Sequence, residues 1–326
     1  MPALWLMSAD FFVFWKTTLN ASFDLALTAA RAAASMQHYP DRTLYVVATP
    51  IGNLADITLR ALHVLELADA IACEDTRHTR PLLRQYGIDK PLLAIHEHNE
   101  VEAASFVIER LQRGERVAYV SDAGTPAVSD PGARLVAATR AAGLRVLPLP
   151  GPSSITTALS VAGVAAVSGE AGFVFAGFLS SKAGERDHAI AALQTEPRTV
   201  IILEAPHRIE ALARAMAPLG ARRVTVGREL TKQFEEIATI AAQDFAQWLA
   251  DGAQRTRGEF ALVLHPPVPS QAADETAISG ENLRVLKLLL AELPLKTAVK
   301  LAAELTSAPR NELYNAALEL KKSIPE

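Results

Sequence analysis

The chain has 326 residues, which is long for one compact domain and predicts two globular domains with additional segments. Half of the residues are hydrophobic, enough to build substantial cores. Charged residues make up 21% and the net charge is -4, which excludes a polycation that binds nucleic acid non-specifically. Any RNA partner must therefore be recognised at a local site.

Cysteine use is minimal, because Cys73 is the single cysteine of the chain. One cysteine excludes an intrachain disulfide and a cysteine-based zinc site, and it suits a reducing, cytoplasmic location. The sequence shows no cluster of metal-ligating residues, so we expect no metal cofactor.

The first 42 residues carry an apolar cluster at 11–15, but Asp10 and Lys16 flank it closely. The cluster is far shorter than the ~20 residues that span a bilayer. It also lacks the basic region and cleavage site of a signal peptide. We expect residues 1–42 to be a disordered extension outside the fold, and no association with a membrane.

From residue 43 onward, apolar strands alternate with helical segments, which predicts an α/β fold with much parallel pairing. The expected first domain, residues 43–165, holds strands at 44–48, 70–73, 92–95, 117–120 and 146–149, with helices at 58–67 and 76–86. The expected second and smaller α/β domain, residues 166–265, holds strands at 173–176, 199–203, 223–226, 236–240 and 260–264, with helices at 186–194, 207–218 and 243–251.

The remainder of the chain reads as a linker and a small helical domain. Residues 266–280 contain three prolines and then polar residues, which is typical of a linker. Residues 281–326 show helical spacing interrupted near Pro294 and Pro309, as in a helix-turn-helix. A helical hairpin used for packing or dimerisation is an equally good interpretation. Charge does not decide, because this segment has seven basic and six acidic residues.

The most informative segment is 121–132, SDAGTPAVSDPG, which directly follows the strand expected at 117–120. Gly124 and Gly132 permit positive φ, whereas Pro126 and Pro131 stiffen the loop and remove two donors. The remaining N–H groups need partners, and water would serve in an ordinary surface loop. The position at the carboxyl end of a strand favours a bound ligand.

Two more loops follow strands of the first domain. Thr-Pro-Ile-Gly-Asn at 49–53 precedes a helix, where backbone N–H groups can face a ligand, but it lacks the G-x-G-x-x-G spacing of NAD-binding folds. Pro-Gly-Pro-Ser-Ser at 150–154 offers Ser153 or Ser154 as the cap of the next helix. All three loops are expected at strand ends in the first domain.

These loops and several further motifs resemble the ribosomal small subunit methyltransferase I family, a branch of the tetrapyrrole methylase superfamily. The matching segments are 44–60, Glu-Asp-Thr-Arg at 74–77, His-Glu-His-Asn at 96–99, 121–132, 204–208, 228–232 and 257–259. They occur in order from residue 43 to the carboxyl terminus. Porphyrin-type methylases carry G-x-G-P-G-D and G-G-D-P in the first two loops, so the sequences here point to the RNA branch.

The resemblance implies an S-adenosylmethionine-dependent enzyme with the cofactor in a cleft between two α/β domains. Its substrate would be the ribose 2'-hydroxyl of a cytidine (position 1402) in the decoding centre of 16S rRNA, free or in the small ribosomal subunit. Related enzymes are homodimers. The residues implied in cofactor binding are Pro50, Asp122, Ala123, Gly124, Thr125, Val128, Ser153, Ser154, Glu204 and Ala205, with the segment near Arg228 and Glu229 closing the site.

Methyl transfer to a hydroxyl requires alignment of the reacting atoms and gains from a base that accepts the proton. The candidates for this catalytic role are His96, Glu204, His207, Glu229 and Glu259. Asp122 is expected to organise its loop instead, by accepting backbone N–H bonds.

Three arginines are candidates for RNA phosphate contacts: Arg77, Arg208 and Arg228. Each could equally pair with a nearby carboxylate, such as Asp75 or Glu229. Two alternatives to rRNA methylation stay open at this point. One is methylation of a tetrapyrrole or another small molecule in the same cleft, and the other is a non-catalytic RNA-binding protein that works through its helical tail.

Overall fold

The computed structural model describes residues 23–95, 100–164, 172–267, 280–306 and 308–322. The chain divides into two compact units, Met1–Pro267 and Val268–Glu326. The larger unit contains two five-stranded sheets and the smaller unit is helical. Within the described residues, no helix is both long and apolar enough to cross a membrane.

The first sheet is entirely parallel, with strand order β3-β2-β4-β1-β5. Its strands are β1 (Thr43–Val47), β2 (Ala70–Cys73), β3 (Leu92–Ala94), β4 (Val117–Val120) and β5 (Arg145–Leu149). A parallel sheet is covered on both faces, which is why β2 and β4 are unbroken apolar runs with every residue buried. The predicted parallel α/β architecture is confirmed.

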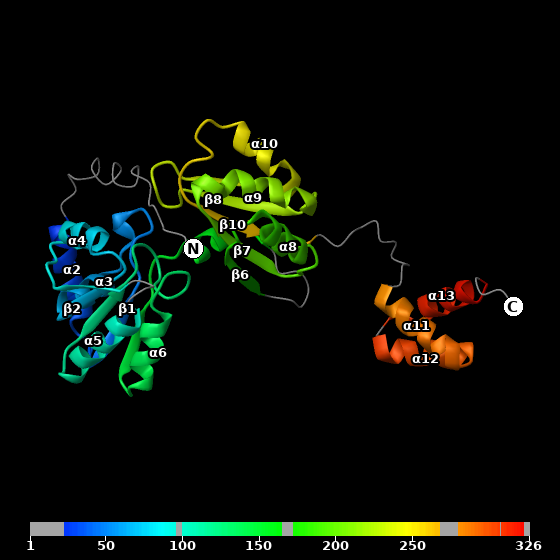
Figure 1. Cartoon of the computed structure of the whole chain (residues 1–326), viewed down its shortest axis with the longest axis horizontal. Helices are drawn as coiled ribbons and strands as arrows, with labels where there is room; N and C mark the ends of the chain where they lie inside the picture. The colour runs from blue at the N-terminus through cyan, green and yellow to red at the C-terminus, as the bar shows by residue number, and fades with distance from the viewer. Residues whose placement is uncertain (1–22, 96–99, 165–171, 268–279, 307, 323–326) are drawn as a thin grey trace. The chain divides into compact units, whose positions relative to one another are not determined.

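Helices cover both faces of this sheet (Figure 1). On one face, α3 (Leu59–Leu67) and α4 (Thr76–Gln85) pack with Tyr45 and Ile71 in one core cluster. On the other face, α5 (Glu100–Gln112) and α6 (Ala133–Ala141) pack with Leu44 and Tyr119 in another.

Helix α2 (Asp24–Ala34) corrects the expectation that residues 1–42 lie outside the fold. Leu27, Ala30 and Ala34 follow helical spacing, and all three are buried in the same cluster as α3. This part of the extension is therefore a component of the first core. Residues 1–22 lie outside the described residues.

The second sheet has the order β6-β7-β10-β8-β9, and only the pair β6–β7 is parallel. Its strands are β6 (Phe173–Phe178), β7 (Thr199–Glu204), β8 (Arg223–Arg228), β9 (Glu236–Ala241) and β10 (Phe260–Leu264). Helices α8 (Ala183–Leu193), α9 (Ile209–Met216) and α10 (Phe245–Ala250) contribute to one core cluster with these strands.

Side-chain alternation along β10 separates the two faces of the second sheet. Phe260, Leu262 and Leu264 belong to the core with α8, α9 and α10. Ala261 and Val263 point to the opposite face, where they pack with α7 (Ser154–Val161) and with residues of the first sheet's loops. This second face therefore joins the two sheets into one unit.

The smaller unit is a three-helix cluster of α11 (Gly280–Glu292), α12 (Leu295–Thr306) and α13 (Arg310–Lys322). Leu286, Val299 and Leu313 come from the three helices and are buried together. The helices break at Pro294 and before Arg310, so the predicted helical pattern with two interruptions is confirmed.

Candidate functional site

The three loops follow strands, as the sequence predicts, and the structure brings them together at one edge of the first sheet. Strands β4, β1 and β5 are neighbours and parallel, so their carboxyl ends lie together. Thr49 and Gly124 exchange two backbone hydrogen bonds, each 2.9 Å from N to O. The Thr125 hydroxyl donates to the Pro152 carbonyl at 3.1 Å. The loops after β1, β4 and β5 are thus bonded to one another in series.

Glycine is needed where these loops approach closely. Gly124 has a φ of 81°, and a Cβ there would lie 3.3 Å from Cγ2 of Ile51. A Cβ on Gly151 would lie 2.9 Å from the Cβ of Ala48, closer than such atoms normally approach. A side chain at either position would push the loops apart.

The far end of the SDAGTPAVSDPG loop is anchored by α5. The buried Glu100 carboxylate accepts N–H bonds from Gly132 at 3.1 Å and Arg134 at 3.0 Å. Gly132 has a φ of 122°, and a Cβ there would collide with the Tyr119 ring. Glu100 therefore caps the amino-terminal end of α6 from another helix and fixes where the loop ends.

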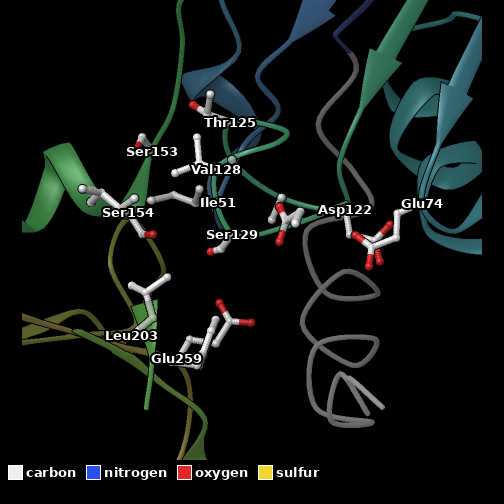
Figure 2. A pocket seen from close by; sticks show the side chains of 15 residues that line it. Ile51, Glu74, Asp122, Thr125, Val128, Ser129, Ser153, Ser154, Leu203 and Glu259 are labelled. Carbon is white, nitrogen blue, oxygen red and sulfur yellow. The ribbon is translucent and has the colours of Figure 1, made fainter. Parts of the chain in front are cut away.

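A pocket lies between these loops and the second sheet (Figure 2). The first sheet's side contributes Ile51, Glu74, Asp122, Ala123, Gly124, Thr125, Val128, Ser129, Asp130, Ser153, Ser154 and Ile155. The second sheet contributes Phe178, Leu203 and Glu259. The pocket combines apolar side chains, exposed backbone, hydroxyls and carboxylates.

Seven of the ten residues predicted to bind the cofactor line this pocket: Asp122, Ala123, Gly124, Thr125, Val128, Ser153 and Ser154. Pro50, Glu204 and Ala205 are not among the lining residues. Ser153 occupies the N-cap position of α7 without a side-chain capping bond, so the predicted capping role is corrected. Its hydroxyl is left for the pocket.

The position of Glu204 follows from strand alternation. Leu203 and Ala261 are paired on the face that meets the pocket, so Glu204 points to the opposite face. There its carboxylate accepts the Ala205 N–H at 2.9 Å and lies 2.9 Å from Nε of Arg208. Burial raises the pKa of Glu204, although Arg208 opposes that effect. The residue holds the turn after β7 and does not face the pocket.

The other candidate bases are placed as follows. His96 lies outside the described residues. His207 is in the short 3-10 helix Pro206–Arg208 and does not line the pocket. Glu229 accepts hydrogen bonds from Lys232 Nζ at 2.7 Å and from the Glu259 N–H at 2.9 Å. Of the four candidates that the structure describes, Glu259 is the one that lines the pocket.

The three arginines differ in exposure. Arg77 keeps 85% of its side chain exposed while pairing with Asp75 at 2.6 Å. Arg208 donates to the Leu179 carbonyl and pairs with Glu204. Arg228 is 6% exposed and donates to the carbonyls of Arg257 and Phe234. Arg77 and Arg208 therefore pair with carboxylates, and Arg77 alone of the three also has a largely exposed side chain. The guanidinium of Arg228 is buried and bonded to two carbonyls, which does not fit the predicted phosphate contact.

Carboxylates that the sequence-based candidate list omits also gather in the pocket. Burial, together with repulsion from Asp122 and Asp130, raises the pKa of Glu74 to about 7. Burial and repulsion from Asp122 and Glu259 raise the pKa of Asp130 to about 6. The pKa of Asp122 is raised by burial and held down by its hydrogen bond with Nδ1 of His78 at 2.8 Å. Figure 2 shows Glu74 and Asp122 at one end of the pocket and Glu259 nearer Leu203.

The sequence contains a signal for two of these residues. Glu74 directly follows β2 and begins the Glu-Asp-Thr-Arg motif at 74–77. Asp130 lies in the SDAGTPAVSDPG loop. Among the described residues, no group of three or more His, Cys, Asp or Glu side chains is arranged to hold a metal ion.

Comparison with known proteins places the fold in a class. A family model described as Tetrapyrrole (Corrin/Porphyrin) Methylases matches residues 43–246. Solved structures agree on the fold: cobalt precorrin-4 methyltransferase has a TM-score of 0.51 at 15% identity and covers 68% of this chain and 94% of its own. Diphthine synthase has a TM-score of 0.52 at 15% identity, covering 68% of this chain and 90% of its own. The larger unit is therefore a tetrapyrrole methylase fold.

Closer relatives define the family within this class. A second model, the RsmI C-terminal HTH domain, matches residues 276–321. Ribosomal RNA small subunit methyltransferase I of Pseudomonas aeruginosa is 48% identical over 280 residues, covering 85% of this chain and 97% of that protein. The protein of the same name from Escherichia coli O157:H7 is 46% identical over 278 residues, covering 85% and 94%. The chain belongs to the ribosomal RNA small subunit methyltransferase I family.

Proposed function

We propose that this protein transfers the methyl group of S-adenosylmethionine to the RNA of the small ribosomal subunit, with a cytidine ribose 2'-hydroxyl in the decoding centre as the acceptor. One observation carries the proposal beyond family membership. Seven of the ten residues implied in cofactor binding, drawn from loops far apart in the sequence, line one pocket. Action on RNA is supported by the relatives' names and by the matched carboxyl-terminal domain.

The pocket residues fit S-adenosylmethionine chemically. Ile51, Leu203 and Phe178 offer apolar contact for the adenine and ribose. Within the described residues, the N–H groups of Ala123 and Thr125 have no hydrogen-bond acceptor, so they are available to a ligand. The ammonium and sulfonium groups carry positive charge, which matches the carboxylates of the pocket.

Gly124 provides a further test of this fit. It lines the pocket, and a Cβ there would crowd Ile51 at 3.3 Å. A side chain at this position would press against Ile51, which also lines the pocket, so glycine keeps this part of the wall open. The residues that would hold the cofactor are thus Ala123, Gly124 and Thr125 through their backbone, with Ser153 and Ser154 at the start of α7.

When bound, the cofactor supplies a methyl carbon that is activated by the adjacent sulfonium. The protein must align the acceptor oxygen with that carbon, exclude water and remove the hydroxyl proton. Glu259 is the proposed proton acceptor, because it is the candidate carboxylate that lines the pocket and comes from the opposite sheet. Its side chain is 44% exposed and can therefore reach an incoming substrate.

Binding of the RNA would use surfaces outside the pocket. Arg77 follows β2 on α4 and presents an exposed guanidinium. The helical unit is a second candidate through its match to the RsmI C-terminal HTH domain. A homodimer and a cytoplasmic location stay predictions.

The test uses small ribosomal subunits from a strain that lacks this gene. Purified protein and S-adenosylmethionine with a labelled methyl group should label those subunits at one cytidine, and nuclease digestion should recover a 2'-O-methylated nucleoside. Glu259→Gln should lower the methylation rate by about 100-fold or more. Labelling of a precorrin-type substrate instead of the subunit would support small-molecule methylation, and absence of cofactor binding in calorimetry would support a non-catalytic RNA-binding protein.

A further inference from the structure

Lys232 occupies an unusual position for a lysine, because its charged end is held inside the protein. Its side chain is 8% exposed. Nζ lies 2.7 Å from Oε1 of Glu229 and 3.2 Å from Oε2 of Glu259. Glu259 lines the pocket, so this lysine binds directly to a pocket carboxylate from behind.

The aliphatic part of Lys232 contacts the loop after β1, which belongs to the other sheet. A Cβ on Gly52 would lie 2.3 Å from Cγ of Lys232, so the lysine fills the space that glycine leaves open. Thr231 approaches the same position, with its hydroxyl 3.0 Å from that Cβ. Lys232 therefore touches the Thr-Pro-Ile-Gly-Asn loop and the Glu259 carboxylate at once.

The turn that delivers Lys232 has a strained backbone. Glu229 has a φ of 51° and Thr231 a φ of 68°, in the left-handed region that non-glycine residues seldom adopt. Such backbone conformations persist where surrounding contacts over-determine them. Here the Glu229 N–H donates to the Glu259 carbonyl at 2.9 Å and the Thr231 N–H donates to Glu235 at 2.6 Å.

We infer that Lys232 is a positioning residue for methyl transfer, whose ammonium group holds the Glu259 carboxylate in place at the pocket. This inference rests on the proposed function and assigns a role that the cofactor-binding residues do not cover. Lys232 itself does not line the pocket, so it acts through Glu259. The contact with Gly52 ties this arrangement to the loop that forms the opposite wall.

The charges around Glu259 explain why a cation is needed. Glu229 shares Lys232 with it, and Asp130 interacts with it electrostatically from the first sheet. Behind the turn, Asp56 and Glu235 add two more carboxylates near Thr231. Burial alone would lower the pKa of Lys232, but Glu259 and Glu229 outweigh it and the pKa is raised. The lysine therefore stays charged, and its removal would leave Glu259 beside Glu229 and Asp130 without this counter-charge.

Lys232→Met tests the inference, because it keeps the aliphatic contact with Gly52 and removes the charge. The rate of methyl transfer to small ribosomal subunits is measured from pH 6 to pH 9. We expect the acidic limb of the profile to move up by about one pH unit or more, with much of the activity recovered at pH 9. In the protein without cofactor, the loss of thermal stability relative to wild type should be larger at pH 8 than at pH 5, because a higher pH favours ionised carboxylates and the variant has no ammonium group to offset their repulsion.

Lys182→Met is the matched control. Lys182 forms an ion pair of the same length, 2.7 Å with Glu185, but its side chain, at the N-cap of α8, is 77% exposed and does not line the pocket. This change should leave the pH profile in place. Lys232→Gln serves if the methionine variant does not fold, because an amide can still donate to Glu259 without a charge and should produce the same shift.

The outcomes separate the two proposals. A rate reduced by one constant factor at every pH in the folded variants would overturn the inference and assign Lys232 a purely structural role. Wild-type protein that binds S-adenosylmethionine and fails to methylate small subunits at any pH would instead overturn the proposed function. In an inactive wild type, the pH-dependent stability difference still reports whether Lys232 compensates the carboxylates.

Discussion

Two carboxylates of the pocket, Glu74 and Asp130, hold their protons to a higher pH than is usual for such groups. The pKa of Glu74 is about 7 and that of Asp130 about 6, in both cases because burial and neighbouring carboxylates disfavour the charged form. A cationic ligand reverses this balance, since it stabilises the ionised carboxylates. Binding of the proposed cofactor is therefore coupled to the loss of protons from these side chains.

This coupling gives a prediction for the pH dependence of cofactor affinity. The Kd for S-adenosylmethionine should fall by about 10-fold between pH 5.5 and pH 8, because Glu74 and Asp130 ionise in that interval. S-adenosylhomocysteine, which is neutral at sulfur, should show a smaller change. Isothermal titration calorimetry at several pH values measures both ligands. Glu74→Gln should flatten the curve, and a curve that is unchanged in this variant would contradict the prediction.

The raised pKa of Glu74 also makes the stability of the folded protein depend on pH. A carboxyl whose pKa is raised in the folded state stabilises the protein at pH values below its unfolded pKa of about 4.3, and that contribution disappears as pH rises through about 7. Glu74→Gln should therefore raise the thermal midpoint relative to wild type at pH 8 and change it little at pH 5. Calorimetric scans of the protein without cofactor at the two pH values provide the measurement.

At the level of single residues, the sequence predicts the pocket walls better than the chemistry inside them. Gly124 and Thr125 could be assigned because their loop follows a strand and carries recognisable residues. The orientation of the Glu204 side chain could not be assigned from the sequence, because it depends on how β7 pairs with β10. The burial of Arg228 likewise depends on carbonyls at Arg257 and Phe234, which only the folded chain brings together.

Helices position the site through capping and packing. Glu100, at the start of α5, is 6% exposed and accepts the N–H groups that begin α6. Because these N–H groups terminate the SDAGTPAVSDPG loop, the capping carboxylate stabilises the loop as well as the helix.

Glu100→Ala should lower the free energy of unfolding by about 1–3 kcal/mol and weaken cofactor binding, because several buried N–H groups lose their acceptor. Glu102→Ala is the control, since Glu102 is exposed in the same first turn of α5. Urea denaturation and calorimetry give the two quantities. Equal stability of the two variants would show that the loop end is fixed by other contacts.

Helix α2 makes a separate prediction about the first core. Leu27→Ala should lower the free energy of unfolding by about 2–3 kcal/mol, because Leu27 is 8% exposed and packs in the cluster beneath α3. Leu25→Ala should have almost no effect, since that side chain is 83% exposed. Chemical denaturation of the two variants compares a buried and an exposed leucine two residues apart.

The strands were predictable because each is a short apolar run that ends in a polar loop or in a loop with glycine or proline. The observed limits of the strands differ from the predicted limits by only one or two residues. The helices were less predictable. No helix is predicted from the sequence at α5 or α6, and α2 is expected to lie outside the fold. The spacing of apolar residues indicates a helix, but the surface against which that helix packs is known only from the folded chain. Which loops converge follows from parallel pairing, but the contribution of Phe178 and Leu203 from the second sheet depends on packing between distant segments.

On the scale of the whole molecule, the pocket lies entirely within the larger unit. Its lining residues run from Ile51 to Glu259, and that unit ends at Pro267. The helical unit has its own core of Leu286, Val299 and Leu313 with their neighbours. Cofactor binding and the contribution of the helices should therefore be separable.

Protein truncated after Pro267 should bind S-adenosylmethionine with a Kd within about twofold of the full chain, because every pocket residue is retained. Methylation of small ribosomal subunits should fall much further, if the helical unit contributes to recognition. Calorimetry and labelled-methyl transfer measure the two effects on the same preparation. Loss of cofactor binding on truncation would mean that the units are not independent.

The alternation of Leu203 and Glu204 along β7 sets a limit on how the chain can change in length. Adding or deleting one residue inside β7 would exchange the two faces and present the Glu204 carboxylate to the pocket in place of an apolar side chain. The connection from β6 through α8 to β7 is not bound by this rule. Natural length variation should therefore fall between the end of β6 at Phe178 and the start of β7 at Thr199. It should spare the six residues of β7 itself.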